Sequence, residues 1–308
     1  MSQMMKMLQI SLRALLLLLP WFGGLVIGEI SQDFSQCLNF FYKETPPQGI
    51  SAGGYVPICQ RYNNQYHFAS LYHRQHRAPL YSAYILNRAD GKRPDVPWMY
   101  EPQLVSHSES PDMQPFPAPK NIYRKVKDSQ AVLWDYKKSG YTRGHLNPSM
   151  HQRTMDDRTA TFTLTNIVPQ REGSNGYTWN QLEREVLERK AFCRGPMYVI
   201  TGVMPYESVA RWIKKRVSVP EYMWSAYCCP SYKSNLPDSV LPFFPTYAAV
   251  GRNDRNSGEE IVPVNPNAND EEWGYDVRRM SLQDLEGILN TRLKKRVSLF
   301  KGLCTNQE

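Results

Sequence analysis

The stretch GYTRGHLNPS, residues 140–149, decides how the rest of the chain is interpreted, and it holds one of only six histidines in 308 residues. If residues 141–146 are extended, alternate side chains share a face, so Arg143 and His145 point the same way. Gly144 lies between them and has no side chain, so another group can approach the backbone closely there. The stretch therefore predicts a short strand that presents a guanidinium beside an imidazole.

An arginine beside a histidine is an unusual pair for a protein core, but it suits an anion. Arg143 offers forked donors for a phosphate, and a neutral His145 can take a proton from water. The competing interpretation is an exposed strand face that carries two unconnected polar side chains. This stretch alone leaves both interpretations open.

A second stretch, TNIVPQREGSNGYTWNQLEREV, starts at residue 165 and places several polar side chains at helical spacing. If a helix begins near Asn175, then Asn175, Trp179 and Glu183 are four residues apart and share one side. Trp179 would anchor that side in the core, and oxygen ligands such as those of Asn175 and Glu183 suit a hard cation such as Mg²⁺. The competing interpretation makes Asn175 a helix N-cap and pairs Glu183 with Arg184 or Lys190 on a solvated face.

The order of strands and helices favours the α+β class, because strands and helices are interleaved with long loops and show no regular βαβ period. Residues 88–120 contain seven prolines, which excludes regular helix there. Alternating or β-branched residues predict strands, and runs of good helix formers predict helices. The expected strands are Pro79–Arg88, Thr159–Val168, Met197–Pro205 and short strands among the prolines of 219–245, and the expected helices are Tyr177–Phe192 and 282–293, the latter capped by Ser281.

The two stretches together resemble the DNA/RNA non-specific endonucleases of the ββα-metal (His-Me finger) superfamily. Those proteins carry an Asp-Arg-Gly-His motif, a strand that ends in Thr/Ser-Asn-Ile-x-Pro-Gln, and then Asn, Trp and Glu at fixed offsets. The corresponding residues here are TRGH, TNIVPQ, Asn175, Trp179 and Glu183. The segments DFSQCLNFFY and MWSAYCC are also similar to the secreted endonuclease domain-containing 1 proteins of vertebrates. The resemblance implies a ββα-metal nuclease core with a mainly antiparallel central sheet, flanked by helices and long loops.

The resemblance also implies a role for each matched residue. His145 would be the general base, and Arg143 would contact the phosphate. Asn166 would orient His145 or the backbone around it. Asn175 would bind one Mg²⁺ per active site directly, with Mn²⁺ as a possible substitute, and Glu183 would hold a metal-bound water. The expected substrate is DNA, RNA or both, and the sequence does not distinguish them or fix the oligomeric state.

One further arginine has to be placed, and one motif residue departs from the family pattern. The family has another arginine upstream of a tryptophan that stabilises the transition state, and if Trp98 is that tryptophan, Arg93 or Arg88 is the corresponding arginine. The first motif residue is Thr142 where the family has aspartate. On an alternating strand Thr142 would face away from His145, which makes it a supporting residue. The loss of the carboxylate keeps an alternative open: a catalytically inactive nuclease fold that binds nucleic acid or an extracellular partner.

Residues 1–28 have the pattern of a secretory signal peptide. Lys6 and Arg13 precede an apolar run from Ala14 to Gly28, with small residues at its end. The run has about 15 residues and contains a proline, which disfavours the alternative of a membrane anchor. We therefore expect a secreted, extracellular chain without a transmembrane anchor after cleavage. Without Lys6 and Arg13, the 37 basic residues become 35 against 29 acidic ones, a net charge of about +6 that suits a polyanionic partner.

The six cysteines all follow residue 28, and an even number in an oxidising compartment predicts up to three disulfides. Cys37 with Cys59 is the most local pairing, and the adjacent Cys228 and Cys229 are expected to bond to different partners. The expected organisation is a signal peptide at 1–28, an N-terminal arm at 29–60 with Cys37 and Cys59, and a non-specific endonuclease domain at 61–304.

Overall fold

A computed structural model describes residues 30, 33–50, 53–302 and 304. The expected signal peptide, residues 1–28, lies outside the described residues. Among the described residues, no helix combines the length and the apolar character that crossing a bilayer requires.

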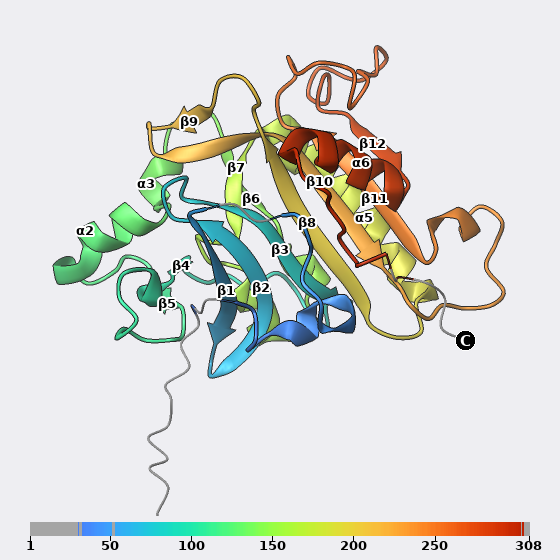
Figure 1. Ribbon diagram of the computed structural model, residues 1–308. Coiled ribbons are helices and arrows are strands. Elements are labelled where there is room, and N and C mark those ends of the chain that lie inside the picture. The colour runs from blue at the N-terminus through green and yellow to red at the C-terminus, as the bar shows by residue number, and fades with distance from the viewer. Residues whose placement is uncertain (1–29, 31–32, 51–52, 303, 305–308) are drawn as a thin grey trace, which may run out of the picture.

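The centre of the fold is a single eight-stranded sheet in which every strand pairs antiparallel to its neighbours (Figure 1). Its order is β1-β2-β3-β8-β10-β11-β12, and β9 pairs with the start of β10. The strands are β1 (Tyr55–Tyr62), β2 (Gln65–His73), β3 (Ala78–Leu86), β8 (Met197–Pro205), β9 (Arg211–Ile213), β10 (Val217–Cys228), β11 (Thr246–Arg252) and β12 (Val277–Met280). Strand β1 crosses the expected boundary between arm and domain at residues 60 and 61.

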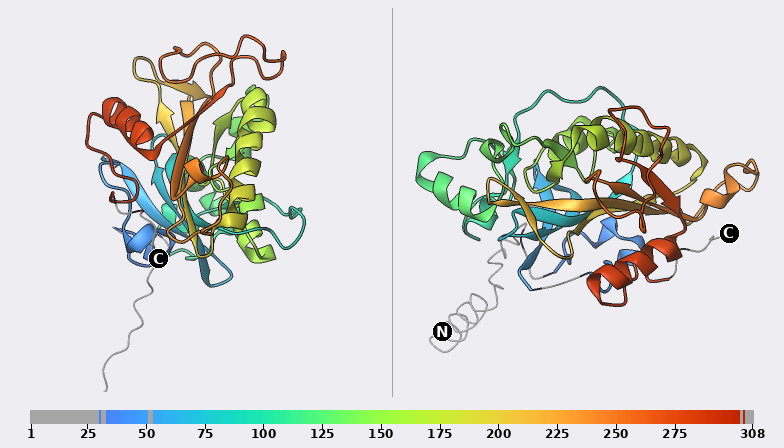
Figure 2. Two further views of the ribbon diagram at one scale, coloured as in Figure 1. Left: turned by 90° about the vertical axis from the view of Figure 1, so that its right-hand side faces the viewer. Right: turned by 90° about the horizontal axis from the view of Figure 1, so that it is seen from above.

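Helices cover both faces of this sheet (Figure 2). Helix α5 (Trp179–Arg189) lies on one face, and α6 (Leu282–Leu293) lies on the other. Ser281 caps α6 by accepting a hydrogen bond from the Asp284 amide, as expected. Further elements lie in the connections: α2 (Lys120–Ser129), α3 (Leu133–Tyr136), α4 (Met155–Ala160), β4 (Met99–Tyr100) and β5 (Gln114–Pro115). The mixed α+β class with an antiparallel central sheet is therefore confirmed.

Strands β6 (Thr142–His145) and β7 (Ile167–Gln170) lie on the same face of the central sheet as α5, with which they form the ββα unit. The two strands form a separate antiparallel pair, and β7 packs against β10 and β3 of the central sheet. A six-residue π-helix, Gly173–Thr178, follows β7 and continues directly into α5. The expected helix at Tyr177–Phe192 is thus confirmed, although it begins earlier and has a different geometry at its start.

The expected strand at Thr159–Val168 is wrong over most of its length. The Thr154 side chain caps α4, which runs through Ala160, so the segment begins as a helix. The threonines that follow are buried and satisfied by side-chain bonds in place of a strand ladder; Thr165, for example, donates to Glu101. Regular pairing starts only at Ile167. The alternating pattern reflected burial of a turn-rich segment and not a strand.

The short strands expected among the prolines of 219–245 are also wrong in part. The structure has one 12-residue strand, β10, that passes through Pro220. The strand tolerates this proline because its pairing with β8 is irregular between Pro220 and Tyr222. The aromatic side chains of Tyr222, Trp224 and Tyr227 on this strand are buried in the core.

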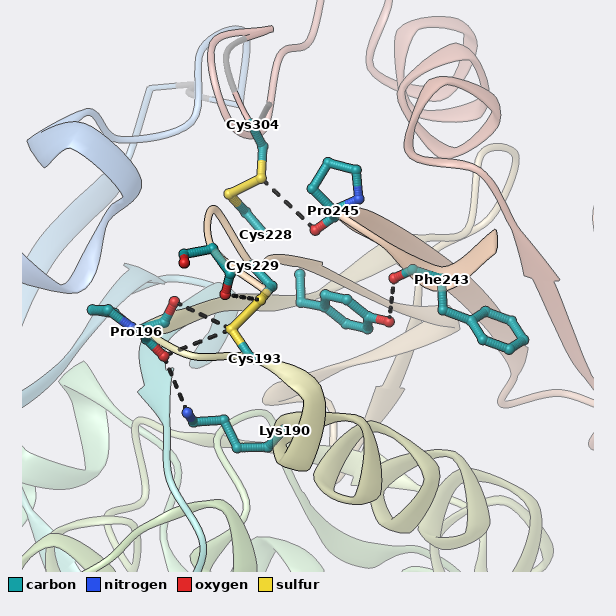
Figure 3. The surroundings of a disulfide bond; sticks show 11 residues. Lys190, Cys193, Pro196, Cys228, Cys229, Phe243, Pro245 and Cys304 are labelled. Atoms are coloured by element: carbon teal, nitrogen blue, oxygen red, sulfur yellow. Dashed lines mark hydrogen bonds between the residues drawn. A yellow bond between two sulfur atoms is a disulfide. The ribbon is translucent and has the colours of Figure 1, made fainter. Parts of the chain in front are cut away.

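Three disulfides connect the described cysteines, and Figure 3 shows the two that involve Cys228 and Cys229. They join Cys37 to Cys59, Cys193 to Cys229, and Cys228 to Cys304. The local pairing and the separate partners of the adjacent cysteines are both confirmed. The last two bonds tie the end of α5 and the C-terminal segment to one end of β10.

Candidate active site

Strand β6 carries the central residues of the candidate site. Pairing with β7 keeps it extended, so Arg143 and His145 face the same way and line one cavity of about 150 Å³. The same cavity is lined by Arg93, Asn175 and Glu183. Five of the predicted site residues, from three separate parts of the chain, therefore meet in one place.

Two aromatic rings enclose the imidazole of His145. Its ring centroid lies 5.3 Å from that of Trp98 and 5.3 Å from that of Phe162. Only 8% of the residue is exposed, and within the described part of the chain its Nε2 atom is buried without a hydrogen-bond partner. A buried polar atom without a partner is costly to the fold. Such an atom in a residue that lines a cavity indicates a group kept for a ligand or for water.

Two guanidinium groups flank this histidine. Arg143 lies over the Trp98 ring at 5.1 Å from its centroid, and Arg93 lies over the Phe162 ring at 4.8 Å. Burial, together with the positive charges of Arg93 and Arg143, lowers the pKa of His145 to about 3. The ring is therefore neutral at physiological pH and can accept a proton.

Asn166 contacts the backbone near His145, and no bond to His145 itself occurs among the described residues. Its Oδ1 accepts hydrogen bonds from the Asn147 amide and the Ser82 hydroxyl, both at 3.0 Å. Its Nδ2 donates to the carbonyls of Asn147 at 2.9 Å and Thr161 at 3.0 Å. The side chain is fully buried, so it fixes the turn that follows the histidine.

Asn175 lies inside the π-helix and is not a helix N-cap. Its Nδ2 donates to the Thr142 hydroxyl at 2.9 Å, and that hydroxyl donates in turn to the Gln170 carbonyl at 2.8 Å. The amide group is thus held in one orientation, and its Oδ1 has no hydrogen-bond partner in the described part of the molecule. π-Helical turns are frequent at functional sites. Here the turn, with Thr142, directs a carboxamide group to the cavity.

Glu183 lies on α5 and is partly exposed. Across the residues that the structure describes, it forms no ion pair with Arg184 or Lys190, contrary to the alternative interpretation of this helix. Burial raises the pKa of Glu183 to about 8, although the positive charges of Arg93 and Arg184 act in the opposite direction. A carboxyl group this poorly compensated fits a site that a cation completes.

The donor atoms of the cavity fit a hard cation that keeps most of its own water. In the described ranges, no group of three or more His, Cys, Asp or Glu side chains could form a closed metal site. One carboxamide oxygen from Asn175 and one carboxylate from Glu183 suit Mg²⁺, which usually takes few protein ligands. The same oxygen donors also suit Mn²⁺.

The chain matches a known protein family over most of its length. The profile of the DNA/RNA non-specific endonuclease family matches residues 47–265. The chain belongs to this family. It is 32% identical to the human (Homo sapiens) endonuclease domain-containing 1 protein over 210 residues, which is 67% of this chain and 41% of that protein. The mouse (Mus musculus) counterpart is 33% identical over 205 residues, or 64% of this chain and 39% of its own.

The chain is also similar to a further relative and to one solved structure. The chain is 31% identical to mitochondrial endonuclease G of Bos taurus over 136 residues, covering 39% of this chain and 44% of that protein. It is similar to the solved structure titled "Crystal structure of the EndoG/EndoGI complex: Mechanism of EndoG inhibition", with a TM-score of 0.48 and 17% identity over 84% of this chain and 89% of that chain. The chain spans about two fifths of the length of the two endonuclease domain-containing 1 proteins.

The structure also separates the two arginine candidates. Arg93 lines the cavity with His145, whereas Arg88 lines a neighbouring cavity. Phe162 contacts His145 and Asn180 lines the same cavity, yet no sequence pattern points to either residue. Phe162 lies in the segment wrongly expected to be a strand, and Asn180 occupies an ordinary helix position. The close approach expected at Gly144 comes from the Gln170 side chain, whose Oε1 would lie 2.2 Å from an added Cβ.

Proposed function

We propose that this chain is a secreted, Mg²⁺-dependent endonuclease that hydrolyses phosphodiester bonds of DNA, RNA or both with little sequence specificity. Membership of the non-specific endonuclease family supports this class of reaction. The observation that carries the proposal is the arrangement around His145. An unpartnered imidazole nitrogen, two guanidinium groups and two oxygen donors share one cavity of about 150 Å³.

In this mechanism His145 accepts a proton from the attacking water as the oxygen–phosphorus bond forms and the bond to the 3′ oxygen breaks. Arg143 and Arg93 bind the non-bridging oxygens, on which charge accumulates. Asn175 and Glu183 would hold Mg²⁺, which supplies Lewis-acid stabilisation of the phosphate and leaving oxygens. The products carry a 5′-phosphate and a 3′-hydroxyl.

The phosphate anion also brings the base closer to its working range. Burial first, and then the charges of Arg93 and Arg143, lower the pKa of His145. A bound phosphodiester neutralises much of that charge and so raises the pKa of the imidazole again. Because the cations of the site face phosphates and not base edges, the same contacts serve any nucleotide sequence.

Secretion and domain division belong to the same proposal. Three disulfides among the described cysteines support folding in an oxidising compartment. The charge and apolar pattern of residues 1–28 support cleavage as a signal peptide. The mature chain would comprise the arm at 29–60 and the endonuclease domain at 61–304.

A plasmid-nicking assay tests the proposal. Purified protein should nick supercoiled DNA in Mg²⁺ or Mn²⁺ and lose this activity in EDTA. His145→Ala should reduce the rate about 10²–10⁴-fold, the usual contribution of a general base, while its melting temperature stays within a few degrees of the wild-type value. Robust cleavage by His145→Ala would remove this residue from the mechanism. If the wild-type protein fails to nick DNA and only retards it in a salt-sensitive manner, the chain is an inactive nuclease fold that binds nucleic acid.

A further inference from the structure

A second cavity, of about 640 Å³, is lined by residues that are close in the chain to those of the candidate active site. Its size is within the range of small-ligand clefts. One acidic side chain, Glu188, lines it together with four basic ones, Arg88, Arg153, Arg184 and Lys190. We call this the basic cavity.

The basic side chains of this cavity lack acidic partners. Several buried and half-buried arginines elsewhere in the molecule are paired, for example Arg216 with Asp135. Within the described residues, none of the four basic side chains of the basic cavity takes part in an ion pair. The Lys190 ammonium group donates to the Gly195 carbonyl at 3.1 Å, and this bond orients the side chain without neutralising its charge (Figure 3). The cavity thus gathers four cations without an ion pair among the described residues, against one acidic side chain, Glu188.

Three segments of the chain line both cavities. The loop after β3 contributes Arg93 to the active-site cavity and Arg88 to the basic cavity. The segment 149–153 contributes its first two residues to the active-site cavity and its last residue, an arginine, to the basic cavity. Helix α5 contributes Glu183 to the first and Arg184 to the second.

Arg184 marks the border between the cavities. Its Nε donates to Asn180 Oδ1 at 2.8 Å, and Asn180 lines the active-site cavity. A polymer whose backbone is held at His145 and leaves along α5 therefore meets Arg184 next. A nucleic acid has a phosphate at every nucleotide, so a run of unpaired cations beside the cleavage site suits the next phosphates of the same strand.

We propose that the basic cavity binds a backbone phosphate adjacent to the one that is cleaved, so that the enzyme favours polymers over dinucleotides. This inference rests on the proposed nuclease function, because it takes the cleaved phosphate to lie beside His145. Arg88 then positions the flanking strand and does not act in the chemistry. The ligand is the phosphodiester backbone of single-stranded or locally opened nucleic acid.

The test measures binding in the cleavage-deficient full-length chain carrying His145→Ala. Fluorescence anisotropy follows a labelled 20-nucleotide single-stranded DNA and a labelled dinucleotide from 50 to 300 mM NaCl. In this background the basic-cavity variant replaces Arg88, Arg153 and Arg184 by Gln. The matched control replaces Lys294, Lys295 and Arg296 by Gln; these three exposed cations follow α6 on the opposite face of the sheet.

The basic-cavity variant should bind the 20-nucleotide strand about tenfold more weakly at 150 mM NaCl and bind the dinucleotide within about twofold of the background. The slope of log affinity against log salt should decrease by about 0.7 for each phosphate of the single strand that the variant no longer binds. The control should change neither quantity. Equal losses in the two variants, or an unchanged affinity and salt slope in the basic-cavity variant, would overturn the inference.

Two control measurements separate a loss of phosphate binding from a loss of folding and from a failure of the proposed nuclease function. Melting temperatures of the variants identify any loss of folding, and the milder single variant Arg184→Gln, which should show part of the same loss, serves if the triple variant unfolds. Nicking by the chain with an intact His145 is measured separately. If that chain does not cleave but the basic-cavity effect persists, the proposed nuclease function fails while the phosphate-binding site stands.

Discussion

Thr142 makes a sharp test of the site, because its side chain contacts Asn175 directly. Its hydroxyl accepts from Asn175 Nδ2 at 2.9 Å and donates to the Gln170 carbonyl at 2.8 Å. Thr142→Val keeps the shape of the side chain and removes both bonds. Asn175 then loses the interaction that orients its carboxamide oxygen toward the cavity.

The structure sets the size of the expected effect. One hydrogen bond contributes about 0.5–1.5 kcal/mol, and about 1.4 kcal/mol corresponds to a tenfold change in an equilibrium constant. Residues that orient a metal ligand typically change metal affinity about 10–100-fold. We therefore expect Thr142→Val to raise the Mg²⁺ concentration for half-maximal nicking about tenfold and to change the rate at saturating Mg²⁺ by less than about threefold.

Two companion variants separate positioning from simple stability. Thr142→Ser keeps the hydroxyl and should retain the wild-type Mg²⁺ requirement. Thr142→Asp can accept from Asn175 but cannot donate to the Gln170 carbonyl, so it should keep the Mg²⁺ requirement and lower the melting temperature by a few degrees. Magnesium titrations and thermal melts of all four proteins provide the readout. An identical Mg²⁺ requirement in the Val and Ser variants would refute a positioning role for Thr142.

Two further predictions concern burial near the site. The His151 ring is buried between the Tyr84 hydroxyl and the Glu183 carbonyl, and burial lowers the pKa of His151 to about 4. In the unfolded chain the His151 imidazole takes up a proton near pH 6.5. Its contribution to the free energy of unfolding is therefore complete above that pH and is lost as the pH falls toward 4, by about 2 kcal/mol between pH 7.5 and 5.0. Urea titrations at both pH values should show a smaller pH effect in His151→Gln, and equal effects would contradict this assignment. Gly144→Ala would place a Cβ 2.2 Å from Gln170 Oε1 and should lower the free energy of unfolding, measured by urea titration, by about 1–3 kcal/mol. The control Gly287→Ala, in an open position of α6, should leave the stability unchanged or raise it slightly. A Gly144→Ala variant as stable as the wild type would show that the strand pair adjusts.

Local patterns predicted the parts of the site that depend on local geometry. Alternation along an extended strand was enough to place Arg143 and His145 on one face, and their shared cavity follows from it. The helix after residue 176 was also predicted, because its helix propensities and the position of Trp179, which is buried, both favour the same helix. In both cases a single segment contains the whole signal.

Long-range packing determined what the sequence did not predict. The segment from Thr159 alternates like a strand, yet its threonines bond to side chains far away in the sequence, such as Glu101. The choice between Arg93 and Arg88 depends on how one loop lies across two cavities. The π-helical turn at Asn175 depends on packing as well, since an added Cβ at Gly173 would lie 2.3 Å from the Tyr275 ring. Contacts between distant segments leave no periodic trace in the chain.

The surroundings of His145 explain why an imidazole and two guanidinium groups are held so close together. Trp98 and Phe162 pack against the imidazole and the two cations, so neither Arg93 nor Arg143 needs a carboxylate to stay in place. A carboxylate there would neutralise the arginines and compete with a phosphate for them. Stacking on aromatic faces instead fixes their position and leaves their forked donors free. The apolar walls also keep the imidazole neutral, so the same packing that binds an anion preserves a base beside it.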